Sequence, residues 1–241
     1  MKIKFIQTLI DIIRGKKNKN NIINNIGNNI ISYDKNDKSF FQFNVIGENN
    51  TIKIKKLAKN NLGKLIINLY GNDNEILIDE NLFIGTNLSI NLGQDHPFQG
   101  KIKNSVFKIG KNCRVEDVIS TSYNSNTKII IGNNCLFSLK VIIYNTDGHP
   151  IYDLKTHNIC NHVNNIIIGD NCWIGYNSTI LKNVQIKNNT IVGWGSVVSK
   201  SFNEENIAIA GNPAKIVKRD ISWKISDPEY IKNKNKELIN E

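Results

Sequence analysis

Between residues 168 and 198, aliphatic residues recur at an unbroken spacing of six. They are Ile168, Ile174, Ile180, Ile186, Val192 and Val198. Four residues after each of the first five stands a smaller residue: Cys172, Ser178, Val184, Thr190 and Ser196. A helix would repeat its apolar positions every three or four residues and an isolated strand every second residue, so neither explains the pattern. A six-residue period is typical of a parallel β-helix, in which each hexad supplies one short strand and one turn.

Three hexads complete one triangular coil, so residues 18 apart are predicted to stack. Ile168 should lie on Ile186, and Ile174 on Val192. The aliphatic residue points inward and the small residue sits at the bend, while Gly, Asn and Asp fill the turns because they tolerate a positive φ. The high Asn content fits a chain with many tight turns. We predict an all-β protein whose parallel β-helix spans residues 22–200.

Other segments depart from this repeat. Residues 1–21 are predicted to form a short helix and a linker. The helix is too short to span a bilayer. We expect it to pack on the first coil or to make a weak peripheral contact with an anionic membrane. From residue 22 to about 104 the repeat is degenerate, which predicts coils with irregular insertions. Residues 149–165 have no hexad register and are expected to protrude as a loop. Residues 201–241 are predicted to be an extension ending in a helical tail.

Charge and cysteine usage narrow the partners and the compartment. The net charge of +10 suggests an anionic partner, and a phosphate-bearing cofactor or an acidic glycan is as compatible with it as nucleic acid. Because no nucleic-acid motif accompanies the charge, we expect no nucleic-acid partner. Three of the four cysteines, Cys113, Cys135 and Cys172, occupy the small position of a hexad, which indicates buried fillers and a reducing, cytoplasmic compartment. The sequence has no HxH, HExxH or Cys/His cluster, and we expect no metal site.

Several short motifs follow one another in the second half of the chain. They are Gly-His-Pro at 148–150, Trp-Ile-Gly at 173–175, Gly-Trp-Gly-Ser-Val-Val at 193–198 and Ala-Gly-Asn-Pro-Ala-Lys at 210–215. As a set, over about residues 109–219, they resemble the left-handed β-helix acyltransferases, in particular galactoside, maltose and bacterial polysaccharide O-acetyltransferases. The resemblance implies a left-handed coil, a homotrimer, and acetyl-CoA bound in a groove between neighbouring subunits.

His149 is the candidate catalytic residue. It stands where the hexad register breaks, and the resemblance implies that it is the general base that takes a proton from an acceptor hydroxyl. His96 belongs to a second His-Pro pair without a long unregistered loop after it, so a structural role is expected. His157 and His162 lie within the loop itself.

The resemblance also implies binding residues for the donor and the acceptor. The candidates for the acetyl-CoA site are Trp173, Tyr176, Trp194, Gly195, Ser199, Lys200, Lys215 and Lys218. Strand alternation predicts that Trp173 points outward, and the lysines suit the CoA phosphates. Trp194 stands where relatives carry a small residue. The candidates for the acceptor site are Asp117, Asn126, Tyr144, Asn145 and Asp147, and Asp147 could instead orient the imidazole of His149.

We therefore predict an acetyl-CoA-dependent O-acetyltransferase that acts on a sugar hydroxyl of a bacterial surface polysaccharide, such as capsule or lipopolysaccharide. One alternative is an N-acetyltransferase acting on a nucleotide-linked amino sugar. Another is a hydratase of the gamma carbonic anhydrase type, which would need three converging histidines. A non-enzymatic solenoid is a further alternative, although an ice-binding face of stacked Thr-x-Thr is absent.

Overall fold

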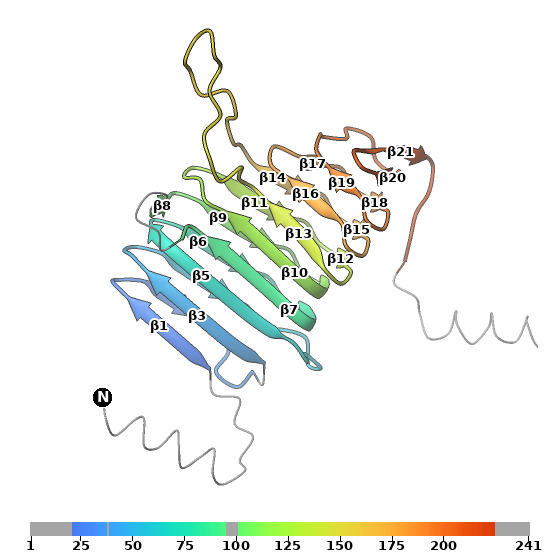
Figure 1. Cartoon of the computed structure of the whole chain (residues 1–241). Coiled ribbons are helices and arrows are strands. Elements are labelled where there is room, and N and C mark those ends of the chain that lie inside the picture. Colours follow the sequence, from blue (N-terminus) through green and yellow to red (C-terminus); the bar gives the residue numbers. More distant parts are fainter. Residues whose placement is uncertain (1–20, 38, 95–100, 225–241) are drawn as a thin grey trace, which may run out of the picture.

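The computed structural model of the chain describes residues 21–37, 39–94 and 101–224. Within these ranges the regular structure consists of strands, and they stack into one long coil (Figure 1). The helices predicted for residues 2–14 and for the C-terminal tail lie outside the described residues. No described helix is long and apolar enough to cross a membrane.

Each complete coil in the C-terminal half contributes one strand to each of three faces. The first face contains β12 (Leu136–Phe137), β15 (Trp173–Ile174), β18 (Ile191–Val192) and β20 (Ala208–Gly211). The second contains β13 (Val141–Tyr144), β16 (Thr179–Leu181) and β19 (Val197–Val198). The third contains β11 (Lys128–Ile131), β14 (Ile166–Ile168) and β17 (Gln185–Ile186). Neighbouring strands on each face are parallel, as the repeat predicts.

The same faces continue toward the N-terminus with longer strands. β10 (Arg114–Ser122) runs across the first and second faces and bends at a bulge between Val115 and Asp117. Below it the second face holds β7 (Phe83–Leu92), β5 (Lys64–Asn72), β3 (Phe40–Ile46) and β1 (Ile22–Ile26), with β8 (Ile102–Lys103) beside the end of β5. The third face holds β9 (Val106–Ile109), β6 (Glu75–Ile78), β4 (Thr51–Ile54) and β2 (Ile30–Ser32).

The predicted register in the C-terminal half is confirmed. Ile168 pairs with Ile186, Ile174 with Val192, and all four side chains are at most 1% exposed. The turns use asparagine in the conformation expected: Asn171, Asn177, Asn183 and Asn189 all have φ between 53° and 64°. Much of the Asn content is therefore structural, because Asn enters this backbone region more easily than most residues do.

The N-terminal coils are longer, as the degenerate repeat predicts. Phe43 pairs with Ile67, 24 residues away, and Ile84 pairs with Val115, 31 residues away. Asparagine side chains also fill the turn between the second and third faces, where buried Asn50 bonds the side chain of Asn74 and the carbonyl of Gly71. These ladders satisfy backbone groups that would otherwise be buried without partners.

The coil does not end at residue 200 as predicted. Phe202 forms a bridge with Ile186, and β20 stacks on β18 as a further partial turn. β21 (Ala214–Lys218) then folds back antiparallel to β20. The sequence hides this turn because residues 199–206 keep Phe202 as their single apolar position and do not continue the hexad, while inward-facing Ile207 and Ile209 are at most 1% exposed.

Candidate functional site

Residues 148–165 leave the coil between β13 and β14 and rise well above it (Figure 1). At their base lies a cavity of about 320 Å³. Its walls include Tyr123 and Asn124 from the preceding coil, and Asp147, His149, Asn161 and His162 from the loop and its root. The structure therefore brings His149 and His162 to one cavity, whereas His157 is not among its lining residues. His96 lies outside the described residues.

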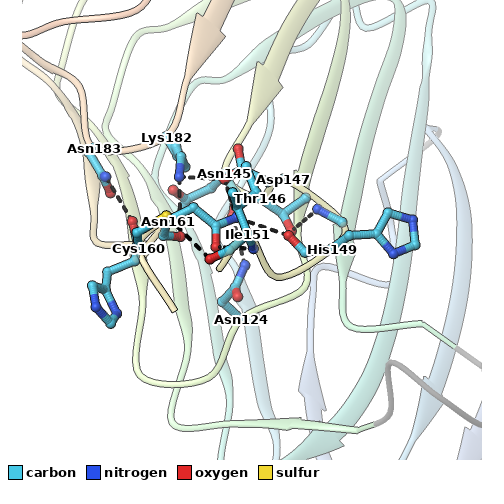
Figure 2. Close-up of polar contacts among 12 residues, drawn as sticks. Asn124, Asn145, Thr146, Asp147, His149, Ile151, Cys160, Asn161, Lys182 and Asn183 are labelled. Carbon is cyan, nitrogen blue, oxygen red and sulfur yellow. Dashed lines mark hydrogen bonds and ion pairs between the residues drawn. The ribbon is translucent and has the colours of Figure 1, made fainter. Parts of the chain in front are cut away.

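Asn161 fastens the returning end of the loop to its starting end (Figure 2). Its amide nitrogen donates to the Asp147 carboxylate at 2.7 Å and to the His149 carbonyl at 2.9 Å. Its side-chain oxygen accepts from the Ile151 amide at 2.8 Å. Asn161 was not a sequence candidate, because nothing distinguishes it from the many turn asparagines of the chain.

Lys182, at the end of β16, ties this network to the next coil. Its ammonium group forms an ion pair with the Asp147 carboxylate and donates to the Asn161 carbonyl at 3.2 Å. Burial alone would raise the pKa of Asp147, but the bonds from Lys182 and Asn161 outweigh burial and lower it. Asp147 is therefore an anion at neutral pH.

The network holds the backbone of His149 and leaves its ring free. The imidazole points away from the network (Figure 2), the residue is exposed, and none of the described residues hydrogen-bonds the ring. The Asp147 carboxylate is engaged by Lys182 and Asn161 rather than by the imidazole. An accessible nitrogen beside a cavity is what a general base needs to reach a bound hydroxyl.

The acceptor candidates fall in different places. Tyr144 faces outward on the second face. Burial raises the pKa of cavity-lining Tyr123, and the nearby Tyr144 adds a smaller contribution. Asn126 lies in an exposed turn, where its side chain accepts from Asn104. Asp117 lies at the bulge of β10, at the opposite edge of the second face.

Asn145 is wholly buried, so its side chain lines the coil interior rather than the surface. Neither of its side-chain polar atoms has a hydrogen-bond partner among the described residues. Its backbone carbonyl accepts from the Asn124 side chain at 3.2 Å, which joins it to a residue of the cavity wall. Any contribution of Asn145 to acceptor binding would therefore be indirect.

Trp173 points outward from the first face, as strand alternation predicts, and is 37% exposed. It lies in a cavity of about 700 Å³ together with Arg114, Leu139, Tyr176 and Trp223. The Trp173 ring centroid is 5.9 Å from that of Trp223, whose indole nitrogen donates to the Asn171 carbonyl at 2.7 Å. Sequence reasoning missed Trp223 because it lies beyond the repeat.

The remaining aromatic candidates meet at the corner between the first and second faces. Tyr176 and Trp194 have ring centroids 4.8 Å apart, and the Lys140 ammonium group lies 5.7 Å from the Tyr176 ring. Trp194 is 76% exposed. Gly195 has a φ of 66° and donates its amide to the Tyr176 carbonyl.

The three candidate lysines do not form one cluster. Ser199 and Lys200 follow β19 at the edge of the second face, where the Lys200 ammonium group lies 5.8 Å from the Phe202 ring. Lys215 and Lys218 lie on β21, which pairs with the first face through β20. All three side chains are exposed.

The His149 cavity and the Trp173 cavity lie at opposite edges of the second face within one chain. His149 follows the last strand residue of β13, whereas Trp173 and Tyr176 precede β16. Among the described residues no group of three or more His, Cys, Asp or Glu side chains is arranged to hold a metal ion. The three stacked bend cysteines, Cys113, Cys135 and Cys172, are buried free thiols.

Comparison with known proteins supports the acyltransferase family that the sequence motifs resemble. The family model described as "Bacterial transferase hexapeptide (six repeats)" matches residues 165–200. The chain is 38% identical over 192 residues to a polysialic acid O-acetyltransferase of Neisseria meningitidis, covering 73% of this chain and 86% of the relative. It is 43% identical over 99 residues to a polysialic acid O-acetyltransferase of Escherichia coli, covering 41% of this chain and 32% of that relative.

The fold is also similar to a crystal structure of the polysialic acid O-acetyltransferase OatWY. That comparison has a TM-score of 0.65 and 32% identity, and it covers 91% of this chain and 97% of the other. The hexapeptide repeat, the similarity of the fold and the sequence identity over most of the Neisseria relative all indicate the same family. This chain belongs to the hexapeptide-repeat acyltransferase family and is an acyltransferase.

Proposed function

We propose that this enzyme transfers the acetyl group of acetyl-CoA to a hydroxyl of an acidic bacterial surface polysaccharide, polysialic acid or a chain of similar chemistry. The observation that carries the proposal is the accessible imidazole of His149 at a cavity between the coil and a fastened loop. The relatives' names support a polysaccharide hydroxyl as the acceptor. The net charge of +10 suits an acceptor that carries carboxylates.

His149 acts as the general base in this scheme. Its neutral imidazole takes the proton of the acceptor hydroxyl while the hydroxyl oxygen attacks the thioester carbonyl carbon. The carbon–sulfur bond then breaks, and the imidazolium returns the proton to the departing sulfur. The products are an acetyl ester and free CoA, so no further reactant is needed.

The proposed working unit is a homotrimer, because one chain does not place both cavities together. The second face and its corner expose apolar side chains that a second copy would cover: Ile119 is 45% exposed, Leu139 42% and Ile142 39%. Packing on this face brings the His149 edge of one copy toward the Trp173 edge of its neighbour. A complete site then takes its base from one subunit and its aromatic wall from another.

Within this unit the donor would lie along the aromatic edge. Trp173, Tyr176 and Trp194 offer apolar walls, and the Gly195 turn allows a close approach of the backbone. Exposed Lys200, Lys215 and Lys218, with Ser199, would bind the phosphate groups as donors and point charges. Since acetyl-CoA is a cytoplasmic metabolite, transfer would take place in the cytoplasm.

The test is thiol release from acetyl-CoA in the presence of polysialic acid and of a panel of neutral and acidic glycans. We expect His149→Ala to lower kcat by about 10²–10⁴, the usual contribution of a general base. His157→Ala, at the loop tip, is the matched control and should keep wild-type rates. His96→Ala is assayed in parallel.

Each outcome has a defined meaning. An acetyl product lost in mild base is an ester, whereas one that survives is an amide and would contradict the hydroxyl acceptor. Loss of activity in His96→Ala but not in His149→Ala would overturn the assignment of the base. If no glycan supports thiol release and the protein does not bind CoA, the proposed function is refuted.

A further inference from the structure

The third face carries a cavity that the proposed reaction does not use. It has a volume of about 390 Å³ and lies over β4, β6 and β9 in the N-terminal half of the coil. Its lining includes Lys53, Lys55 and Lys108, with Leu77 and Asp79 between them. This volume is large enough for a small ligand or one or two sugar units of a longer chain.

The charges in this cavity are not balanced. Lys55 is paired with Asp79 at 3.0 Å and reaches Glu80 at 3.9 Å. Lys53 and Lys108 form no ion pair with any described residue, and both are exposed. The pKa of Asp79 is lowered, first by the Glu80 backbone amide, then by Lys55, and to a smaller extent by the charge of Lys108, but the only ion pair that Asp79 forms with the described residues is with Lys55. Two ammonium groups therefore remain available to an anion.

The strand register sets these two lysines on either side of an outward-facing apolar residue. Lys53 pairs with Leu77, and Leu77 pairs with Lys108, on three consecutive strands. Adjacent strands lie about 4.8 Å apart, so the two lysine backbones are separated by about 10 Å. This arrangement offers an apolar floor for the CH face of a sugar ring and a cation at each end for a carboxylate.

The same row of outward positions leads toward the loop. From Lys108 it continues to Ile130 on β11 and Ile167 on β14. The loop rejoins the coil directly before β14, which stands at the foot of the loop in Figure 1. A chain molecule lying along this face would therefore run between the lysine cavity and the His149 cavity.

We propose that this third-face cavity is a second binding site for an acidic polysaccharide, in which Lys53 and Lys108 bind carboxylates of sugar units remote from the unit that is acetylated. The inference rests on the proposed function for the identity of the chain. The charge favours a polyanion over a second copy of this protein, since three lysines line this cavity, whereas exposed Ile119 and Ile142 lie on the second face. Such a site makes long chains better substrates than short ones without changing the chemistry.

The experiment compares Lys53→Gln/Lys108→Gln with Lys35→Gln/Lys59→Gln, which removes the same charge from two exposed lysines that do not line the cavity. With polysialic acid of graded length as acceptor, the first variant should raise KM about tenfold for long chains. It should leave kcat and the KM for the shortest accepted chain unchanged. The control variant should match the wild type throughout.

A binding arm keeps the inference testable if no acetyl transfer is found. Titration of the wild type with polygalacturonate, a model polycarboxylate, should show salt-sensitive binding that the first variant weakens and the control keeps. Equal KM changes for short and long chains would overturn the proposal, as would unaltered binding in both assays. A change in oligomer mass in the first variant would instead make this face a subunit contact.

Discussion

Replacing Asn161 by alanine tests whether the loop root positions His149. The change removes the bonds to the Asp147 carboxylate, to the His149 carbonyl and from the Ile151 amide. A hydrogen bond to a charged group contributes about 1.5–3 kcal/mol and a neutral one about 0.5–1.5 kcal/mol. Because Asn161 is only half-buried, water replaces part of each bond, and we expect a net loss of about 2 kcal/mol.

A loss of 2 kcal/mol shifts the equilibrium between the fastened and released loop root about thirtyfold, since 1.4 kcal/mol is tenfold. Hydrogen exchange of the Cys160 amide reports this opening, because that amide donates to the Ile151 carbonyl across the loop at 2.8 Å and does not bond to Asn161. We expect exchange to accelerate by about thirtyfold. The fall in kcat depends on how often the released root still presents His149 correctly, and it should not exceed the same factor.

Asn158→Ala is the matched control. Asn158 lies in the same loop, is exposed, and its side chain makes no hydrogen bond with the described residues. It should leave both exchange and kcat unchanged. Faster exchange at Cys160 with wild-type kcat would refute the claim that the root positions His149. Unaltered exchange in Asn161→Ala would refute the energy assigned to its bonds.

Three more predictions concern stability. Because the folded pKa of Asp147 lies below its unfolded value of about 3.9, its ion pair stabilises the fold above that pH and the contribution is lost as pH falls through the folded pKa. The difference in thermal midpoint between wild type and Lys182→Met should therefore be largest near pH 7 and vanish in acid. Trp223→Ala should lower the thermal midpoint by about 4 °C and red-shift the tryptophan emission, since it uncovers the neighbouring Trp173 ring, whereas 76%-exposed Trp194→Ala should leave the midpoint unchanged. Ile180→Ala empties a wholly buried coil position and should cost about 2–5 kcal/mol in urea unfolding.

The coil was predictable from sequence because its stabilising contacts repeat. Ile174 meets Val192 for the same reason that Ile168 meets Ile186, so one register fixes all the others. The partial turn at β20 was not predictable, since residues 199–206 carry no hexad although Ile209 still stacks on Val192. Periodicity reports a strand only where the turns between strands keep a constant length.

The residues of the candidate site also fall into two groups, those that the repeat marks in the sequence and those that it does not. The sequence made His149 a candidate because it interrupts a repeat, and Trp173 because strand alternation turns it outward. Asn161 and Trp223 were not, because each is recognised only by the partner it meets across the fold. Residues that support a site through one long-range contact leave no local pattern.

In the proposed trimer, the stacking of the coil would allow two distant edges to serve one reaction. The loop with His149 leaves the coil between β13 and β14, and Trp173 is the first residue of β15, the strand after β14. The two residues therefore belong to adjacent levels of the stack. In the proposed trimer, rotation about an axis parallel to the coil changes the edge that is presented but keeps its level. A neighbour's Trp173 therefore lies one level from β13, which precedes the loop, and inserting a whole coil between the two would move them apart by about one further strand spacing of 4.8 Å. Inserting one 18-residue coil between Asn165 and Ile166, directly before β14, should thus abolish acetyl transfer while leaving the coil folded, and retained activity in that variant would contradict a site shared between subunits.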